Sequence, residues 1–294
     1  MQAGQAVTCA GSMAAAIAGL TRLRHPTEHA APEPLASGGT GTAVRLVMAT
    51  VICCSGIMRS ASTWSYNVCR ELSLRSQIRG SEVTHYGYSN QTDETIREWA
   101  AIEKKRGIIV RGVMKAHVIA PGTRRLIARG KIANVFTIRD PRDAMSSMLR
   151  FGQEKSEKEK SFLLEYFCYV LKQGLAFLED GHSLVIRYEE MVDDPAAKIR
   201  AIARYLGRPI GEQALSAAAQ AAGVKRARAI VARLEAEAQP GEDHFDGHSQ
   251  LHVGHLNGGT IGRWRDELDA DFKARVEEAF APYLAAYGYD GSTG

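Results

Sequence analysis

The sequence predicts one α/β domain around a mostly parallel sheet, and three observations lead to this prediction. Short apolar runs of strand length alternate along the chain with longer stretches of helical period. The run from Val44 to Cys54 is mostly apolar, as is typical of a strand buried on both faces in a parallel sheet. No internal repeat interrupts this alternation, which favours helices packed on a central sheet.

Composition and length narrow the class of protein. The chain has 294 residues, of which 45% are hydrophobic and 24% charged, as in ordinary soluble globular proteins. A chain of this length can bury a large core without disulfides or a structural metal. Collagen, coiled coil, a disulfide scaffold and global disorder are excluded. The net charge of +4 is too small to indicate a nucleic-acid partner, and no apolar stretch reaches the roughly 18 residues of a membrane span.

The N-terminal segment and the cysteines bear on organisation and location. Residues 1–43, rich in Ala, Gly, Pro and Thr, are expected to be a disordered leader before a domain at 44–290, although Met48 could be the true start. The first twenty residues resemble a signal peptide only weakly, because a basic start is missing. An odd number of cysteines without a C-x-x-C pair favours buried free thiols and a cytoplasmic location: Cys9, Cys53, Cys54, Cys69 and Cys168.

The expected elements follow in order. We expect strands at about 44–54, 108–115, 132–138 and 183–189. We expect helices at about 62–75, 93–105, 121–129, 141–151, 160–180, 195–207, 211–237 and 269–287. The segment with Tyr86 and Tyr88 is expected to be a loop, as is the Gly- and His-rich stretch 239–262. Ligands of parallel sheets bind at the carboxyl ends of strands, where this reading places Arg59, His117, Arg139 and Tyr188.

The loop after the first strand has the chemistry of a phosphate site. Residues 55–64 read SGIMRSASTW, in which small residues let backbone N–H groups approach an anion at a helix N-terminus. Ser62 and Thr63 add hydroxyls, and Arg59 adds a positive charge. The loop departs from the nucleoside-triphosphate pattern G-x-x-x-x-G-K-[ST], because Ala61 and Ser62 replace the second Gly and the Lys. A phosphate ligand is therefore expected, whereas Mg²⁺-assisted ATP hydrolysis is not. A Ser-capped helix start is the structural alternative.

A second candidate anion site follows the strand at 132–138. Arg139 begins the sequence RDPRD, and Ser147 lies two helical turns further on. A guanidinium can bind a phosphate through two hydrogen bonds while the hydroxyl adds a third. A helix start with a surface Arg–Asp pair is the structural alternative here. Two such sites on neighbouring strand ends suggest one ligand with phosphates at both ends.

These segments together resemble the sulfotransferases that use 3′-phosphoadenosine 5′-phosphosulfate (PAPS). The 5′-phosphosulfate loop of that family, roughly [KR]-S-[GA]-[ST]-T-[WF], is matched by residues 59–64, and its R-[ND]-P-[KR]-D motif with a later Ser is matched by residues 139–147. Residues 187–191 read RYEEM with Asp194-Pro195 after them, and residues 259–264 read GTIGRW, as in two further blocks. The resemblance covers about 44–289 and implies a P-loop-type fold with a five-stranded parallel sheet.

The resemblance also implies roles for individual residues. Arg59, Ser62 and Thr63 would hold the 5′-phosphosulfate, with Ser60 and Ala61 giving loop backbone. Trp64 would lie against adenine or pack in the core, and Tyr188 would reach the adenine side. Arg139 and Ser147 would bind the 3′-phosphate, to which the Gly259 N–H would also donate.

The C-terminal block departs from the pattern of the cytosolic enzymes. A basic pair that precedes the Gly there is Asn257 and Gly258 here. His252, His255 or Arg263 could supply the missing charge. The dimer motif of the cytosolic members is not visible after Trp264, so the oligomeric state stays open.

A catalytic base is expected after the strand at 108–115. Lys115-Ala116-His117 resembles the K-[TA]-H segment whose His is the base in the cytosolic enzymes. A neutral imidazole suits removal of a proton from an acceptor hydroxyl near pH 7. Lys115 and Arg59 could stabilise charge that develops on the sulfuryl group. A backbone-bonded His is the alternative, and a carboxylate base in 82–98 is a further one.

Other features have simpler interpretations. His244, His248, His252 and His255 are spaced as on a metal-binding helix face, but Gly247 and Gly254 argue against a continuous helix, and the reaction needs no metal. A mobile substrate lid is favoured there. The basic residues of the helical stretch 211–237 are expected to be solvated, with an anion contact as an alternative: Lys225, Arg226, Arg228 and Arg233. The aromatic segment with Phe162, Tyr166, Phe167 and Tyr169–Val170 is expected to be core, with a place in the wall of the acceptor pocket as the alternative for some of these residues.

The sequence thus predicts an enzyme that moves the sulfuryl group from PAPS to a hydroxyl of a small-molecule, lipid or sugar acceptor by in-line displacement. A P-loop nucleoside or small-molecule kinase and a non-catalytic adenosine-bisphosphate-binding module are the alternatives. No metal, nucleic acid or membrane span is expected, and the acceptor is not readable from the sequence.

Overall fold

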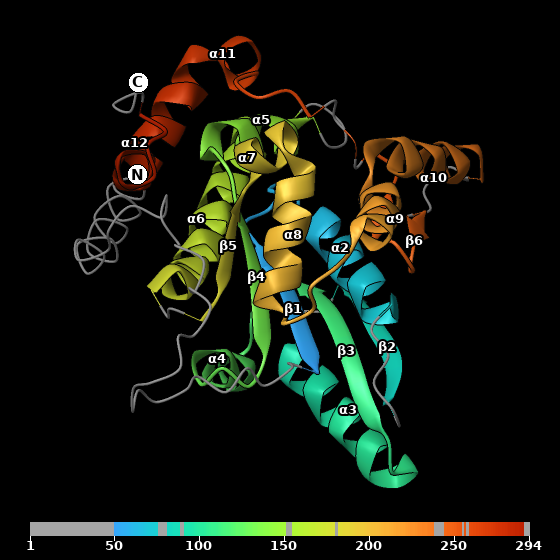
Figure 1. The fold of residues 1–294 in the computed structure, drawn as a ribbon. Helices are drawn as coiled ribbons and strands as arrows, with labels where there is room; N and C mark the ends of the chain where they lie inside the picture. Colours follow the sequence, from blue (N-terminus) through green and yellow to red (C-terminus); the bar gives the residue numbers. More distant parts are fainter. Residues whose placement is uncertain are drawn as a thin grey trace, which may run out of the picture.

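Five parallel strands in the spatial order β2-β3-β1-β4-β5 form the central sheet of the protein (Figure 1). The structure is a computed structural model that describes residues 50–75, 81–88, 91–150, 155–179, 182–237, 244–254, 256 and 259–290. The strands are β1 (Val51–Gly56), β2 (Ser81–Tyr88), β3 (Ile109–Ala116), β4 (Ala133–Ile138) and β5 (Leu184–Arg187). A short antiparallel hairpin, β6 (Phe245–Asp246) and β7 (Leu251–His252), stands apart from this sheet.

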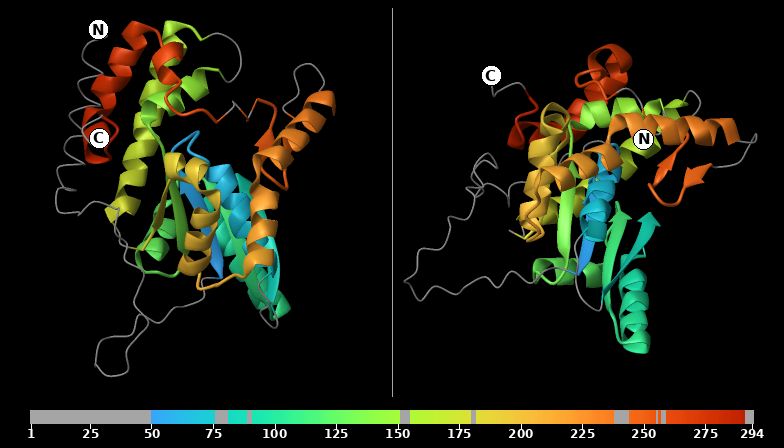
Figure 2. Two further views of the ribbon diagram at one scale, coloured as in Figure 1. Left: turned by 45° about the horizontal axis from the view of Figure 1, so that its top comes forward. Right: turned by 45° about the vertical axis from the view of Figure 1, so that its right-hand side comes forward.

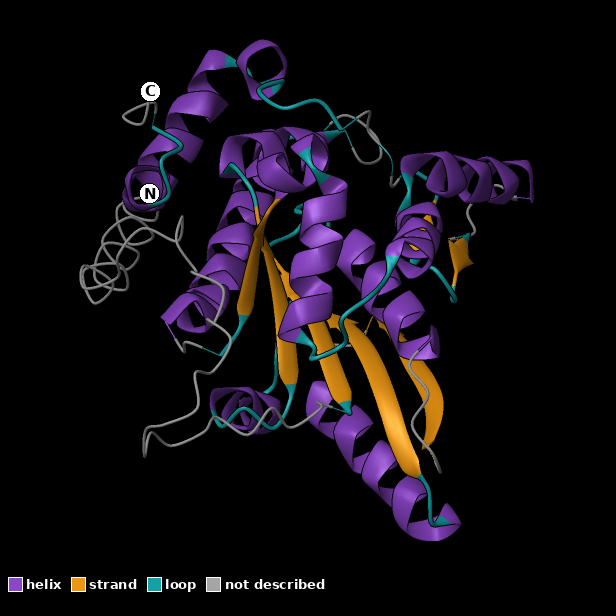
Figure 3. Cartoon of the chain, in the orientation of Figure 1, coloured by secondary structure: helices purple, strands orange, loops and turns teal. Residues whose placement is uncertain are grey.

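The helices lie on both faces of the sheet, as the three views show (Figures 1–3). They are α2 (Ser62–Arg75), α3 (Thr92–Arg106), α4 (Pro121–Ala128), α5 (Pro141–Leu149), α6 (Glu157–Glu179), α7 (Tyr188–Asp193), α8 (Pro195–Tyr205), α9 (Glu212–Ala222), α10 (Val224–Glu237), α11 (Trp264–Glu267) and α12 (Ala270–Ala286). Two of them begin at the predicted Asp-Pro pairs, where Asp140 and Asp194 accept backbone N–H groups of the first turn.

Two hydrophobic layers hold the helices to the sheet because successive strand residues point to opposite faces. On one face Cys53, Met114 and Phe136 pack against residues of α6 and α12. On the other face Ile52, Val113 and Val135 pack against α2, α8 and α9. The central strands are therefore covered on both sides, as their apolar sequences predict, and the predicted α/β fold is confirmed.

The strand order brings the carboxyl ends of β3 and β4 to either side of the carboxyl end of β1. From β1 the chain crosses to the edge strand β2, returns to β3 beside β1, and then passes to β4 on the other side of β1. Ser55 pairs with Ala116 of β3, and Gly56 pairs with Thr137 of β4. The three carboxyl ends therefore lie together, and the crevice of this topological switch point opens between their loops.

Several predicted boundaries are wrong in an informative way. The segment with Tyr86 and Tyr88 is not a loop: its backbone forms the edge strand β2, which has one neighbouring strand and whose sequence, SEVTHYGY, contains no apolar run. Tyr188 does not lie in a strand but starts α7, because Arg187 has the extended backbone of a helix cap and acidic residues follow. The stretch 239–262 contains the β6–β7 hairpin. The part of the first predicted strand before Thr50, and the predicted leader, lie outside the described residues.

Burial corrects two further predictions. Phe167 and Val170 of α6 are core residues, but Phe162 and Tyr169 are 65% and 48% exposed because the helix has a solvent face. Cys53, Cys54 and Cys69 are buried free thiols as predicted. Cys168 is disulfide-bonded, so the prediction of free thiols is wrong at that position. Within the described ranges, no helix has the length and apolar character needed to span a bilayer.

We predict that Gly112→Ala destabilises the fold. A Cβ atom built at Gly112 in β3 would lie 2.1 Å from the Trp99 ring of α3, which is buried. Such overpacking costs about 1–3 kcal/mol of unfolding free energy, measurable by urea denaturation. Gly247→Ala is the matched control, since its Cβ would meet only Phe245 at an ordinary 3.8 Å. Equal stability of the two variants would contradict the packing account.

Candidate active site

The loop between β1 and α2 has the backbone of an anion cradle. Arg59 and Ala61 both have positive φ, 61° and 75°, a conformation that side chains other than Gly rarely adopt. Such strain persists only where the surroundings enforce it. Ser60 contributes to this, because its buried hydroxyl lies 2.6 Å from Ile57 O and 2.7 Å from Thr137 Oγ1. Ser60 therefore faces the protein and supports the loop, as its expected backbone role requires.

Arg139 links the two predicted anion sites directly. Its Nη1 donates to the carbonyl oxygen of Arg59 at 3.1 Å, so the guanidinium lies against the loop after β1. The Arg59 Nε in turn donates to Ser147 Oγ at 2.9 Å. The residues expected to bind the two ends of one ligand are thus adjacent in space.

The guanidinium of Arg139 is buried yet incompletely satisfied. Only 6% of Arg139 is exposed, and its Nε is a buried donor that no group of the described chain accepts. The Tyr188 ring stacks on it, with 3.9 Å between the ring centre and Cζ. An orphaned charged donor beside a strained loop and a hydroxyl is the arrangement expected for an oxyanion ligand.

Asp143 joins this cluster to the C-terminal loop. Its Oδ2 lies 3.6 Å from Arg139 Nη2 and accepts the Gly262 N–H at 2.7 Å, while its Oδ1 accepts the Trp264 N–H at 3.2 Å. Tyr188 Oη donates to Gly259 O at 3.2 Å. The left-handed φ of 71° at Gly259 suits this close approach of the loop.

His117 lies directly after β3 with a defined tautomer. Its Nδ1 is 2.8 Å from Gly56 O. Since a carbonyl can only accept, Nδ1 carries the proton of the neutral ring and Nε2 carries the lone pair. Burial and the neighbouring Lys115 lower the pKa of His117 to about 4. The imidazole is consequently neutral near pH 7.

Lys115 is the buried cation beside this histidine. Burial and the charge of Arg59 lower its pKa to about 8. Burial and the charge of Arg139 likewise lower the pKa of Arg59 to about 10. The mutual effect shows that positive charge is concentrated around the loop after β1.

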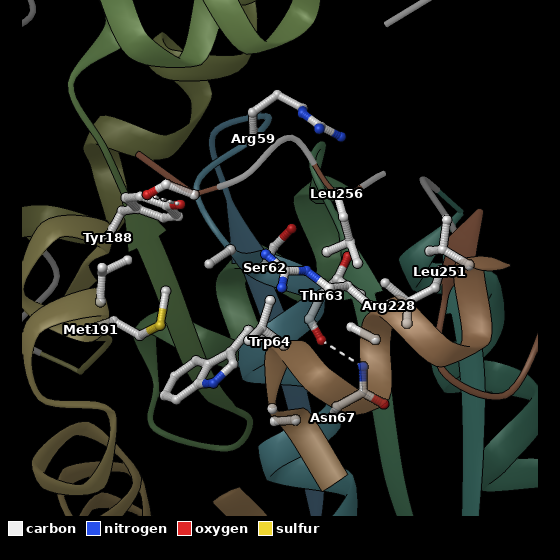
Figure 4. A pocket seen from close by; sticks show the side chains of 18 of the residues that line it. Arg59, Ser62, Thr63, Trp64, Asn67, Tyr188, Met191, Arg228, Leu251 and Leu256 are labelled. Atoms are coloured by element: carbon white, nitrogen blue, oxygen red, sulfur yellow. Dashed lines mark hydrogen bonds between the residues drawn. The ribbon is translucent and has the colours of Figure 1, made fainter. Parts of the chain in front are cut away.

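One cavity of about 930 Å³ brings these groups together. It is lined by every predicted site residue except Ser60: Arg59, Ala61, Ser62, Thr63, Trp64, Lys115, His117, Arg139, Ser147, Tyr188 and Gly259. Figure 4 shows Arg59 at one end of the cavity, and Trp64 and Met191 at the other. Trp64 is half-buried, so it both borders the cavity and packs against the sheet face that α2 covers.

Other residues that line the cavity were not predicted from the sequence, or were named there only as an alternative. Arg150 and Asn67 also line it, as does Arg228 from α10, whose side chain points into the cavity (Figure 4). Asn67 Nδ2 donates both to Thr63 O and to Ser249 O at 2.8 Å. The second of these hydrogen bonds connects α2 to the β6–β7 hairpin. The seven-residue spacing of Asp143 and Arg150 could have revealed a common helix face; nothing in the sequence indicated Asn67.

The residues suggested as replacements for the missing basic pair lie in different surroundings in the structure. His252 lines the cavity, whereas Arg263 is paired with Glu267 through Nε and Oε1 at 2.7 Å and does not line it. His255, Asn257 and Gly258 lie outside the described residues. In the described part of the chain, His, Cys, Asp and Glu side chains form no group of three or more that could hold a metal ion.

Comparison with known proteins agrees with this geometry. The family model described as "Sulfotransferase domain" matches residues 57–288. The chain belongs to the sulfotransferase family. The family match confirms the predicted enzyme class, a PAPS-dependent sulfotransferase. No curated protein sequence matches the chain significantly.

Solved sulfotransferase structures share the fold at low sequence identity. A retinol dehydratase in complex with androsterone and the inactive cofactor PAP is 16% identical, with a TM-score of 0.52 and 80% of each chain covered. Mouse sulfotransferase SULT7A1 complexed with PAP is 14% identical, with a TM-score of 0.52, 84% of this chain and 92% of that chain covered.

We predict that Asp143→Asn weakens the contacts between α5 and the C-terminal loop and lowers the stability of the protein. An amide keeps one acceptor oxygen but leaves the buried Arg139 without its counter-charge. Removal of one partner from a buried charged pair costs about 2–4 kcal/mol of unfolding free energy, measured by urea denaturation. Asp193→Asn on the exposed end of α7 is the control. A loss no larger than that of the control would contradict the assigned role of Asp143.

Proposed function

We propose that the protein transfers the sulfuryl group of PAPS to a hydroxyl group of an acceptor by in-line displacement. One observation carries the proposal: two anion-binding clusters and a neutral histidine with a defined tautomer line the same cavity. The products would be a sulfate ester and adenosine 3′,5′-bisphosphate (PAP).

The residues present fit a doubly anionic nucleotide. The strained loop at 59–61 and the hydroxyls of Ser62 and Thr63 suit the 5′-phosphosulfate at the N-terminus of α2. Arg139, with its unsatisfied Nε, and Ser147 suit the 3′-phosphate. Trp64 and Tyr188 border the cavity with aromatic surface that suits the adenine base.

His117 is proposed as the general base. Its Nε2 lone pair would accept the proton of the attacking hydroxyl, while Gly56 O holds the ring through Nδ1. The acceptor oxygen then forms a bond to sulfur as the bond between sulfur and the bridging oxygen breaks. The electron pair of that bond leaves with the 5′-phosphate of PAP.

Lys115 and Arg59 are proposed to stabilise the charge that develops on the departing phosphate. Both cations flank the loop. Burial, and then the charge of a neighbouring arginine, lowers the pKa of each. Such preorganised charge contributes a few kcal/mol of barrier reduction.

The acceptor is proposed to be a hydroxyl-bearing small molecule, lipid or sugar. The neighbouring structures contain androsterone and retinol as ligands of those proteins. In this chain, apolar cavity residues such as Leu251 and Leu256 suit an acceptor with an apolar portion (Figure 4). A cytoplasmic location is proposed as well: the buried free thiols of Cys53, Cys54 and Cys69 favour it, whereas the disulfide of Cys168 does not.

We predict that His117→Ala abolishes transfer but not nucleotide binding. Loss of the base lowers kcat by about 10²- to 10⁴-fold, measured with ³⁵S-labelled PAPS and a panel of alcohols and phenols. The affinity for PAP, measured by calorimetry, stays within about twofold because His117 does not bind the phosphates.

The matched control is His182→Ala, which changes an exposed histidine just before the amino end of β5. A His117→Ala variant with the wild-type rate would overturn the base assignment. Mg²⁺-dependent ATP turnover by the wild-type protein would favour a kinase instead, and PAP binding without transfer to any acceptor would favour a non-catalytic module.

The pH dependence of kcat/KM for PAPS is a further prediction. Lys115 acts in its protonated form, so the rate should be full below its pKa of about 8 and fall above it. His117 acts in its neutral form and, with a pKa of about 4, should cause no loss between pH 6 and 8. Lys115→Arg should move the alkaline limb to higher pH, because a guanidinium stays protonated there. An unchanged alkaline limb would contradict the role of Lys115.

A further inference from the structure

The C-terminal end of α5 carries a cation that faces the same cavity as the candidate 3′-phosphate residues. Asp143, Ser147 and Arg150 are spaced i, i+4 and i+7, so they lie along one face of the helix. Asp143 contacts Arg139, and Ser147 contacts Arg59. Arg150, the C-cap residue, extends this row and lines the cavity.

Glu267 of α11 contacts Arg150 and holds its side chain in place. Its Oε2 lies 3.3 Å from Arg150 Nε, and its Oε1 lies 2.7 Å from Arg263 Nε. The same carboxylate accepts a hydrogen bond from Ser146. Glu267 is thus shared by two guanidinium groups, and its contact with Arg150 fixes that side chain at the cavity wall.

Two further cations of the cavity, Arg139 and Arg59, lie near Arg150. The charge of Arg139 lowers the pKa of Arg150, after the effect of burial, and Arg150 in turn contributes to the lowered pKa of Arg59. Arg139 is itself nine-tenths buried and has an unsatisfied Nε. Arg59, Arg139 and Arg150 therefore lie near one another at the wall of one cavity, where their combined positive charge favours an anionic ligand.

We propose that Arg150 is a third binding residue for the 3′-phosphate of the nucleotide, together with Arg139 and Ser147. This role rests on the proposed function, and it offers a replacement for the basic pair of the cytosolic enzymes, whose positions are Asn257 and Gly258 in this chain. Arg150 supplies that charge from the end of α5 instead of from the C-terminal loop.

The test compares two nucleotides that differ only in the 3′-phosphate. We would measure the affinities of the full-length protein for PAP and for adenosine 5′-monophosphate by calorimetry, in wild type, Arg150→Ala and Arg150→Lys. A charged hydrogen bond predicts that Arg150→Ala weakens PAP binding about 10- to 100-fold and leaves monophosphate binding within about twofold. Arg150→Lys should restore part of the PAP affinity.

The control is Arg263→Ala, which removes the other guanidinium paired with Glu267 but no group that lines the cavity. It should retain the wild-type preference for PAP. Unchanged PAP affinity in Arg150→Ala, or equal losses for both nucleotides in Arg150→Ala and Arg150→Lys, would overturn the role of Arg150. A wild-type protein that does not prefer PAP to the monophosphate would instead overturn the proposed function itself.

Discussion

The site depends on the contact between the Arg139 side chain and the backbone of the loop after β1. The donated bond from Arg139 to Arg59 O, at 3.1 Å, joins the end of β4 to the end of β1. Asp143 holds the same guanidinium and also accepts two N–H groups of the C-terminal loop. Segments 121 and 119 residues apart in the chain are thus joined through the Arg139–Asp143 pair.

This arrangement concentrates unfavourable terms in a small volume. Two non-glycine residues have left-handed backbone, and several cations lower one another's pKa values. The repulsion between the cations would be relieved by an anion with several oxygens, which accepts N–H donors and offsets the charges. The parallel sheet and its two hydrophobic layers stabilise the fold enough to offset this local cost in free energy.

The sequence predicts the parts of this site that depend on strand ends and loop chemistry. Apolar runs locate β1, β3 and β4, and the parallel topology then brings Arg59, His117 and Arg139 to one edge. Residues whose role depends on tertiary contacts are harder to predict. The contacts of Asp143 require the C-terminal loop to be in place, and the sequence of the edge strand β2, SEVTHYGY, has no apolar run like those of the central strands. Helix spacing could have placed Arg150, but only the fold shows that its face meets the cavity.

Asn67 connects two walls of the cavity. Its amide donates to Thr63 O inside the first turn of α2 and to Ser249 O in the β6–β7 hairpin. Arg70, one turn further along α2, donates to His248 O of the same hairpin. Two side-chain hydrogen bonds from α2 therefore hold the hairpin that carries Leu251 and His252 to the cavity, so a displacement of α2 would carry the opposite cavity wall with it.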